Sequence, residues 1–265
     1  MLHPGLYEQV INNALNSELA EIPEARKSTA PIDTAEAAKV LAQYLTDVVQ
    51  KGLENVQDNG GGIEAQIQLA NQIINTIQAT TEEADFAALS VDQRAEQLLA
   101  LLQQNDPRLA TGKSAKDLDR PETSIAQSSL FTGAIHEPQM YTELKKEIVS
   151  ADRIDMLVSF IKWSGLRLIM GELRQFVQSG GELRIITTSY MGATDVKAIE
   201  ELRALPNTKI KVSYDTKRTR LHAKTYVFYR GTGFTTAYVG SSNLSNAAIS
   251  SGLEWNVKVT RKDLP

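Results

Sequence analysis

The chain of 265 residues contains no cysteine and only three histidines. The lack of cysteine excludes a disulfide framework and a thiolate metal site. No apolar run approaches the ~18 residues that a membrane span needs, and the first residues lack the basic and apolar stretches of a signal peptide. We therefore expect a cytoplasmic protein that has no membrane partner.

The charge is divided unevenly along the chain. Residues 1–125 carry 9 Lys and Arg against 19 Asp and Glu, a balance of −10, whereas residues 126–265 carry 19 against 13, a balance of +6. Apolar residues make up 42% and charged residues 23%, which are globular values. A basic excess favours contact with a phosphate backbone, so the second half is the half expected to bind nucleic acid.

The first half of the chain shows the apolar periodicity of helices. Asp33 resembles an N-cap with Glu36 as its capping-box partner, and Gly60–Gly62 resembles a loop between helices. The TGKS at residues 111–114 resembles the end of a P-loop, but Pro107 occupies the position of its first glycine, so no nucleotide site is predicted. We expect a helical region over residues 1–120, with helices at 6–19, after Asp33, around 63–77 and at 91–104 behind a Ser90 cap.

Strands and helices alternate in the second half, after a polar linker at residues 106–128. The pattern is typical of an α/β fold with a largely parallel sheet. Ligands bind such sheets beyond the carboxyl ends of the strands, so Thr188–Asp195 is either a substrate loop or an ordinary turn capped by Thr194 or Asp195. The expected strands are SLFTGA, 154–161, 182–190 and 209–215, and the expected helices are 138–149, 165–177 and 195–205.

The most informative stretch runs from Leu221 to Val259. His222 and Lys224 are two residues apart in a run of strand formers, where side chains i and i+2 share a face at a distance of about 7 Å. Asn243 follows Lys224 by 19 residues, at the end of a second strand-like run, and Glu254 follows Asn243 by 11 in a third. Three adjacent strands would bring the four side chains together.

These residue types suit phosphodiester cleavage without a metal or other cofactor. A neutral imidazole can attack phosphorus, and Lys224 can stabilise the charge that builds on the non-bridging oxygens. Asn243 and Ser241 can donate hydrogen bonds to the same oxygens, and a carboxylate such as Glu254 can fix the tautomer of His222. The alternatives are a structural histidine, a solvated strand lysine, an Asn243 that caps the following helix, and an exposed strand glutamate.

The motif HAK followed by GSSN resembles the HxK…GSxN signature of the phospholipase D superfamily. The form HxKxxxxD would place Asp where this chain has Tyr229. The departure favours the nuclease branch, in which a Glu on the strand after GSxN replaces that Asp, as Glu254 does. With PGLYEQVI, FIKWSGLRLI, TTSYMGATD and RLHAKTYVFYR, the chain resembles the amino-terminal region of bacterial proteins that fuse such a nuclease to a superfamily 2 helicase.

The resemblance implies a phospholipase D-like mixed sheet flanked by helices over residues 121–265. It implies a nuclease that cleaves DNA through a phosphohistidine, and a homodimer that shares one active site because the chain has a single motif. It also implies a helicase motor in the same, longer polypeptide. The basic residues before the motif are expected to bind backbone phosphates or to form a solvated basic turn; they are Lys217, Arg218 and Arg220.

The same residues allow a second function. The protein would then be a nucleic-acid docking module that keeps the fold and cleaves poorly. Lipid hydrolysis is disfavoured because no amphipathic basic helix is found that would bind a membrane surface. Loss of turnover on replacement of His222 would distinguish the enzyme from the docking module.

Overall fold

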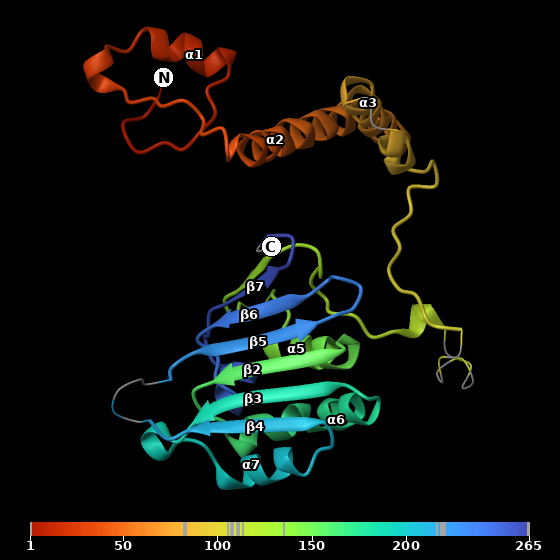
Figure 1. Ribbon diagram of the computed structural model, residues 1–265, viewed down its shortest axis with the longest axis vertical. Coiled ribbons are helices and arrows are strands. Elements are labelled where there is room, and N and C mark those ends of the chain that lie inside the picture. The colour runs from red at the N-terminus through yellow and green to blue at the C-terminus, as the bar shows by residue number, and fades with distance from the viewer. Residues whose placement is uncertain are drawn as a thin grey trace. The chain divides into compact units, whose positions relative to one another are not determined.

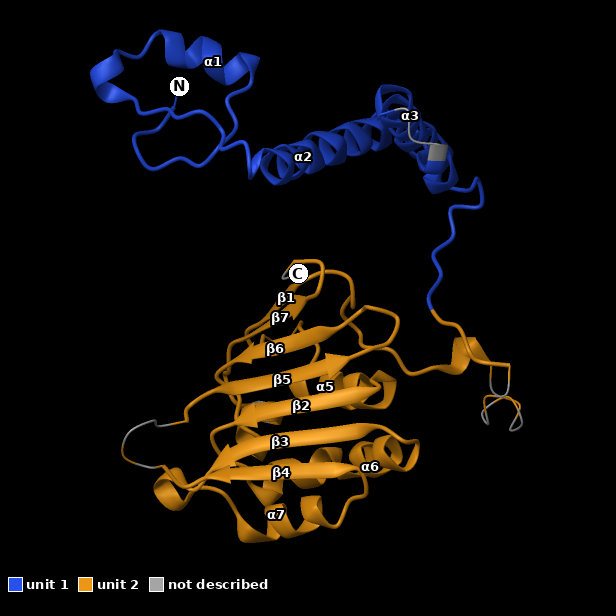
Figure 2. Ribbon diagram, in the orientation of Figure 1, with its two compact units in different colours: residues 1–99 blue, residues 100–265 orange. Residues whose placement is uncertain are grey.

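The computed structural model describes residues 2–81, 84–104, 106, 109, 112, 114–134, 136–215, 217 and 221–263. The chain divides into two compact units, residues 1–99 and residues 100–265 (Figure 2). The boundary expected from sequence, between residues 120 and 121, lies inside the second unit.

The described residues of the first unit form α1 (Asn13–Ala20), α2 (Ala37–Asp58) and α3 (Ile63–Thr81), with 3-10 turns at Glu24–Arg26 and Ala84–Leu89. The predicted glycine loop joins α2 to α3, and Gly60 takes a positive φ of 82° there, which glycine adopts without strain. The first helix starts later than the expected residue 6. The Asn12 side chain accepts from the Leu15 N–H at 2.9 Å and fixes the start as an N-cap.

Two further predictions in this unit are wrong. Asp33 does not cap α2, because its carboxylate accepts from the Ala35 N–H at 2.8 Å in a preceding turn, and the helix begins after Glu36. The described residues 91–104 contain no helix. The Asn71 side chain donates to the Val91 carbonyl at 3.0 Å and accepts from the Val91 N–H at 2.8 Å, and so takes the first carbonyl that a helix there would use.

The first unit buries little apolar surface. Ile67 is the one buried hydrophobic residue among its described residues, while Leu41, Leu45 and Val48 of α2 are exposed. Short helices gain most of their stability from packing an apolar face, so the main core of the chain lies in the second unit. No described helix in either unit is long and apolar enough to cross a membrane.

The second unit is built on a seven-stranded sheet with the order β1-β7-β6-β5-β2-β3-β4 (Figure 1). β2, β3 and β4 pair in parallel, and the other neighbouring pairs are antiparallel. The sheet is therefore mixed, as the resemblance implies, rather than largely parallel, because the chain returns after β4 to add three consecutive antiparallel strands. The strands are β1 (Ser129–Phe131), β2 (Arg153–Val158), β3 (Glu182–Thr188), β4 (Thr208–Ser213), β5 (Lys224–Tyr229), β6 (Thr236–Gly240) and β7 (Asn256–Thr260).

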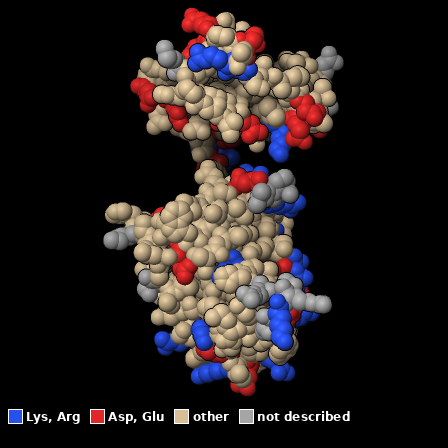
Figure 3. Space-filling view, turned by 90° about the vertical axis from the view of Figure 1, so that its left-hand side faces the viewer, with Lys and Arg blue, Asp and Glu red and all other residues tan. Residues whose placement is uncertain are grey.

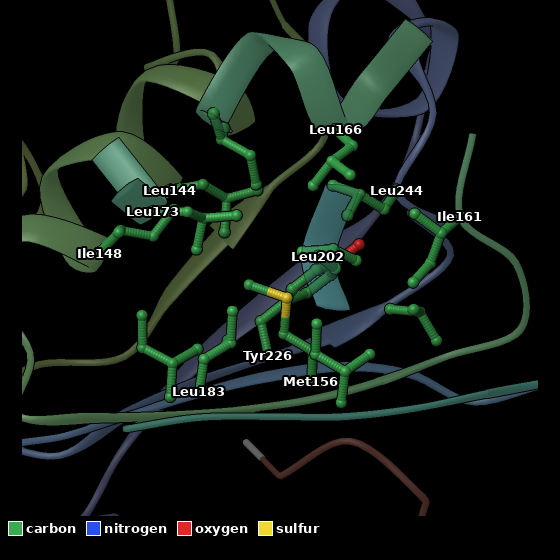
Figure 4. Packing of buried hydrophobic residues seen from close by; sticks show 14 of the residues in the cluster. Leu144, Ile148, Met156, Ile161, Leu166, Leu173, Leu183, Leu202, Tyr226 and Leu244 are labelled. Carbon is green, nitrogen blue, oxygen red and sulfur yellow. The ribbon is translucent and has the colours of Figure 1, made fainter. Parts of the chain in front are cut away.

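Three helices pack on the sheet, α5 (Met140–Ser150), α6 (Trp163–Gln178) and α7 (Val196–Arg203) (Figure 1). In Figure 4, Leu144, Leu173 and Leu202 from these helices gather with Met156 and Tyr226 of the strands. Burial alternates along β2, as expected for a strand with one face on a core. The predicted α/β fold with a mixed sheet flanked by helices is confirmed.

A buried charged network joins α5 to the antiparallel half of the sheet. Glu147 is fully buried and forms ion pairs with Arg230 and, at 2.9 Å, with Lys258. The hydroxyls of Thr236 and Tyr238 donate to the same carboxylate at 2.8 and 3.0 Å. A buried charge is tolerated only when it is paired and hydrogen-bonded in this way.

Candidate active site

The predicted site residues meet at one edge of the sheet. His222 lies just before β5, Ser241 and Asn243 follow β6, and Glu254 lies two residues before β7. Since β5, β6 and β7 are adjacent and antiparallel, the start of β5, the end of β6 and the start of β7 share an edge (Figure 1). Three adjacent strands therefore position the motif as the spacing predicts, although Glu254 precedes its strand instead of lying within it.

His222 and Lys224 are in direct contact. The Lys224 Nζ lies 2.9 Å from Nδ1 and 3.0 Å from Nε2 of the His222 ring, and it donates to the His222 carbonyl at 2.9 Å. The Lys224 ammonium therefore lies against both nitrogens of the His222 ring. His222 is exposed whereas Lys224 is buried.

Burial lowers the pKa of the Lys224 ammonium, and the negative charge of Glu254 opposes that shift. A desolvated cation interacts strongly with an anion that enters the site, because little water screens the pair. Lys224 therefore combines burial, a fixed position and a direct contact with an exposed imidazole.

Asn243 is fixed by the loop after β2. Its Oδ1 accepts from the Phe160 N–H at 3.2 Å, and beside it the Lys162 N–H donates to the Leu244 carbonyl at 2.8 Å. The alternative of a helix cap is wrong, because Ser245 Oγ accepts from Ala248 N–H at 3.3 Å in the π-helical turn Ala247–Ser251. Among the described residues nothing accepts from the Asn243 Nδ2, which leaves that amide as a donor for a ligand.

The two serines of GSSN have different surroundings. Ser242 is buried, and its hydroxyl accepts from Asn256 Nδ2 at 2.8 Å. Ser241 is exposed, but its hydroxyl accepts from the Trp255 N–H at 3.1 Å, which ties it to the segment before β7. The structure thus gives Ser241 a structural partner, and its expected contact with substrate stays a prediction.

Glu254 is half-buried and close enough for its charge to act on Lys224 and on Tyr226. Within the described part of the chain, no hydrogen bond joins its carboxylate to the His222 ring. Nor do the described residues include a group of three or more His, Asp or Glu side chains that could hold a metal ion. The orienting role expected for Glu254 is therefore not formed in this single chain.

The basic residues before the motif are only partly described. Lys217 is exposed and its N–H donates to the Asp215 carboxylate at 3.1 Å, while Arg218 and Arg220 lie outside the described residues. Figure 3 views this end of the second unit, where Lys and Arg form separate groups between large uncharged areas. The positive charges of the described residues at this end are therefore dispersed.

A pocket opens beside His222. It has a volume of about 320 Å³ and is lined by Ser159, Phe160, Tyr190, Met191, Ala193 and His222. Its walls are the segments that follow β2 and β3, so the candidate substrate loop 188–195 does lie against the site. Ser159 and Phe160 were not predicted as pocket residues, although their place at the carboxyl end of a strand was a usable signal.

A glycine allows α6 to approach the motif, and its replacement gives a stability test. A Cβ on Gly165 would lie 2.5 Å from Ser245 Cα, whereas a Cβ on Gly171 of the same helix would meet nothing within 4 Å. We expect Gly165→Ala to lower the free energy of unfolding by about 1–3 kcal/mol through overpacking. Gly171→Ala, the matched control, should raise it by about 0.5–1 kcal/mol.

Urea denaturation followed by circular dichroism measures both variants. An unchanged stability in Gly165→Ala would show that the helix and the Ser245 segment are not packed as tightly as the distances indicate. The pair of variants separates steric contact from helix propensity, because both carry the same chemical change.

The second unit is similar to a known protein family. Residues 144–264 match the family model described as "Cardiolipin synthase, PLD-like domain". That range contains β2 to β7, the histidine-lysine pair and the GSSN turn. This part of the chain is therefore similar to a PLD-like domain, in agreement with the resemblance of the motif.

Several solved structures give partial matches. NucT from Helicobacter pylori is 21% identical, with a TM-score of 0.40 over 50% of this chain and 84% of that one. Nuc from Salmonella typhimurium, a phospholipase D family member, is 23% identical, with a TM-score of 0.38 over 51% and 84%. Yeast tyrosyl-DNA phosphodiesterase is 12% identical, with a TM-score of 0.34 over 50% and 31%. No curated protein sequence matches the chain.

Proposed function

We propose that the PLD-like domain is a phosphodiester hydrolase that uses His222 as its nucleophile. The observation that carries the proposal is the contact of an exposed imidazole with a buried ammonium, the Lys224 Nζ lying 2.9 Å from His222 Nδ1. The match to the PLD-like family over residues 144–264 supports the same conclusion.

The first step forms a bond between a His222 ring nitrogen and phosphorus and breaks the bond from phosphorus to the leaving oxygen. The electron pair goes to the leaving oxygen, which takes a proton from a general acid. Water then attacks the phosphohistidine, which releases the phosphate and restores the imidazole. Lys224 and the Asn243 amide stabilise the non-bridging oxygens during both displacements.

Nucleic acid is the proposed substrate, and DNA the proposed form of it. The resemblance of the motif to the nuclease branch supports this substrate, and the basic balance of residues 126–265 agrees with an anionic polymer. A link to a helicase motor in the same longer polypeptide belongs to the same proposal and rests on the sequence resemblance.

The deciding experiment is cleavage of end-labelled single-stranded and duplex DNA by the full chain in excess EDTA. The proposed residues supply the nucleophile and the positive charge themselves, so cleavage should persist with chelator present. Binding without cleavage would instead favour the docking module.

A homodimer follows from the single motif, since a second positioned proton donor is needed and a two-fold axis supplies one. An exposed apolar strip on the open face of the sheet fits a second copy. Leu130 pairs with Val257 and Val257 with Val239, and these side chains are 50%, 42% and 49% exposed on one face. We expect Val257→Asp to convert the dimer to a monomer and to abolish cleavage.

Sedimentation velocity measures the mass in solution. The control is Val196→Asp, because Val196 is an exposed valine at the start of α7, away from the strip. A native chain that is monomeric and still cleaves DNA would contradict the shared site.

A further inference from the structure

We propose that the pocket beside His222 is a nucleobase subsite, which makes single-stranded nucleic acid the preferred substrate. The proposal rests on the phosphodiesterase function above and names what that site accepts next to the scissile phosphate. The residues that line the pocket include two aromatic residues, Phe160 and Tyr190, and the exposed Met191. Nucleobases stack on aromatic side chains whatever the sequence of the nucleic acid, because every base has a planar face.

The pocket is joined to the phosphate-binding residues by hydrogen bonds. The Phe160 N–H donates to Asn243 Oδ1 at 3.2 Å, and the Ser159 hydroxyl donates at 3.3 Å to the carbonyl of Ala223, between His222 and Lys224. A ligand group in the pocket is therefore held in a fixed relation to a phosphate on His222. The volume of about 320 Å³ lies within the range of small-ligand pockets.

The turn at Tyr190–Gly192, which lines the pocket, has a strained backbone that hydrogen bonds hold in place. Met191 has a φ of 60°, which is left-handed and unfavourable for a residue other than glycine, and its side chain is 81% exposed. The Thr188 hydroxyl accepts from the Tyr190 N–H at 3.0 Å and donates to the Ser213 carbonyl at 2.9 Å, which anchors the turn to β4. Strain of this kind persists where the surrounding structure enforces it, and it is concentrated at ligand sites.

Duplex DNA cannot use this subsite without disruption. In a duplex each base is paired and stacked, and it must leave the helix to enter a pocket. In a single strand the bases splay out readily and stack on aromatic side chains. A pocket that holds one base next to the reacting phosphate therefore favours single strands over duplexes.

The test compares two probes of equal charge, a twelve-residue oligothymidylate and an oligomer of the same length in which every nucleotide is abasic. Fluorescence anisotropy gives the Kd of each for the full chain. We expect the native chain to bind the base-bearing probe about 5- to 150-fold more tightly, the range that base–aromatic stacking covers. Tyr190→Leu and Phe160→Leu should bring the ratio toward one, and Phe234→Leu, an exposed aromatic in another pocket, should leave it unchanged.

Met191→Gly serves as a variant that folds readily, because glycine adopts its φ without strain. Met191→Gly should also reduce the preference for the base-bearing probe over the abasic probe. Equal Kd values for the two probes in the native chain, or an unchanged ratio in both aromatic variants and in Met191→Gly, would overturn the subsite.

Cleavage of the same probes separates the subsite from the proposed function. Equal cleavage of both probes would retain the hydrolase and overturn the subsite. Absence of cleavage, with tighter binding of the base-bearing probe that depends on Tyr190, would retain the subsite and overturn the hydrolase.

Discussion

The His222→Ala variant is expected to lose DNA cleavage by a factor of more than about 10³, because removal of a nucleophile leaves only binding and charge stabilisation. The ring of His222 is exposed and contacts Lys224, so its loss removes no buried packing. The variant should therefore fold normally and bind DNA with nearly native affinity. The measurement is the rate of cleavage of end-labelled DNA in excess EDTA, with the Kd determined on the same preparation.

The matched control is His136→Ala, which removes an exposed histidine that is not part of the site. It should cleave at the native rate. Residual cleavage in His222→Ala at more than a tenth of the native rate would assign the chemistry to another group. An acid quench of the native reaction should in addition trap phosphate on His222, since a phosphoramidate bond forms during turnover.

The placement of the candidate site residues could be predicted from sequence because it is mostly local. His222 and Lys224 are close because they are two apart at the start of one strand, and Asn243 follows the neighbouring strand of the same antiparallel set. The hydrogen bond from Phe160 N–H to Asn243 Oδ1 was not predictable, since it joins groups 83 residues apart. Long-range contacts of this kind depend on strand order, which periodicity does not give.

The second unit matched its predicted elements more closely than the first for a physical reason. Each of its helices buries an apolar face on the sheet, as Leu166 and Leu173 of α6 do, so the periodic pattern and the observed burial coincide. In the first unit, exposed residues such as Leu98 and Leu101 follow a helical spacing, yet no helix forms among the described residues there. A short amphipathic segment is marginal unless its apolar face is packed.

Replacement of Glu147 by alanine is expected to lower the free energy of unfolding by about 3–5 kcal/mol, because it leaves buried cations without their partner. Arg230 and Lys258 are 9% and 0% exposed and both pair with this carboxylate. The hydroxyls of Thr236 and Tyr238 lose their acceptor in the same variant. Urea denaturation at pH 7, followed by circular dichroism, measures the change. Glu182→Ala is the control, since the pair of Glu182 with Lys209 is exposed and is expected to contribute little to stability.

The same carboxylate makes stability depend on pH in acid. Burial alone would raise the pKa of Glu147, but the charges of Arg230 and Lys258 outweigh it and hold the pKa below its usual range. A carboxyl whose folded-state pKa is depressed stabilises the fold above its unfolded pKa of ~4.3, and that contribution is lost as the pH falls through the folded value. The native chain should therefore lose stability in this acid window. The Glu147→Gln variant, whose free energy of unfolding is already lower at pH 7, should lose less of it. If the free energy of unfolding falls equally with pH in the two proteins, other carboxylates cause the loss.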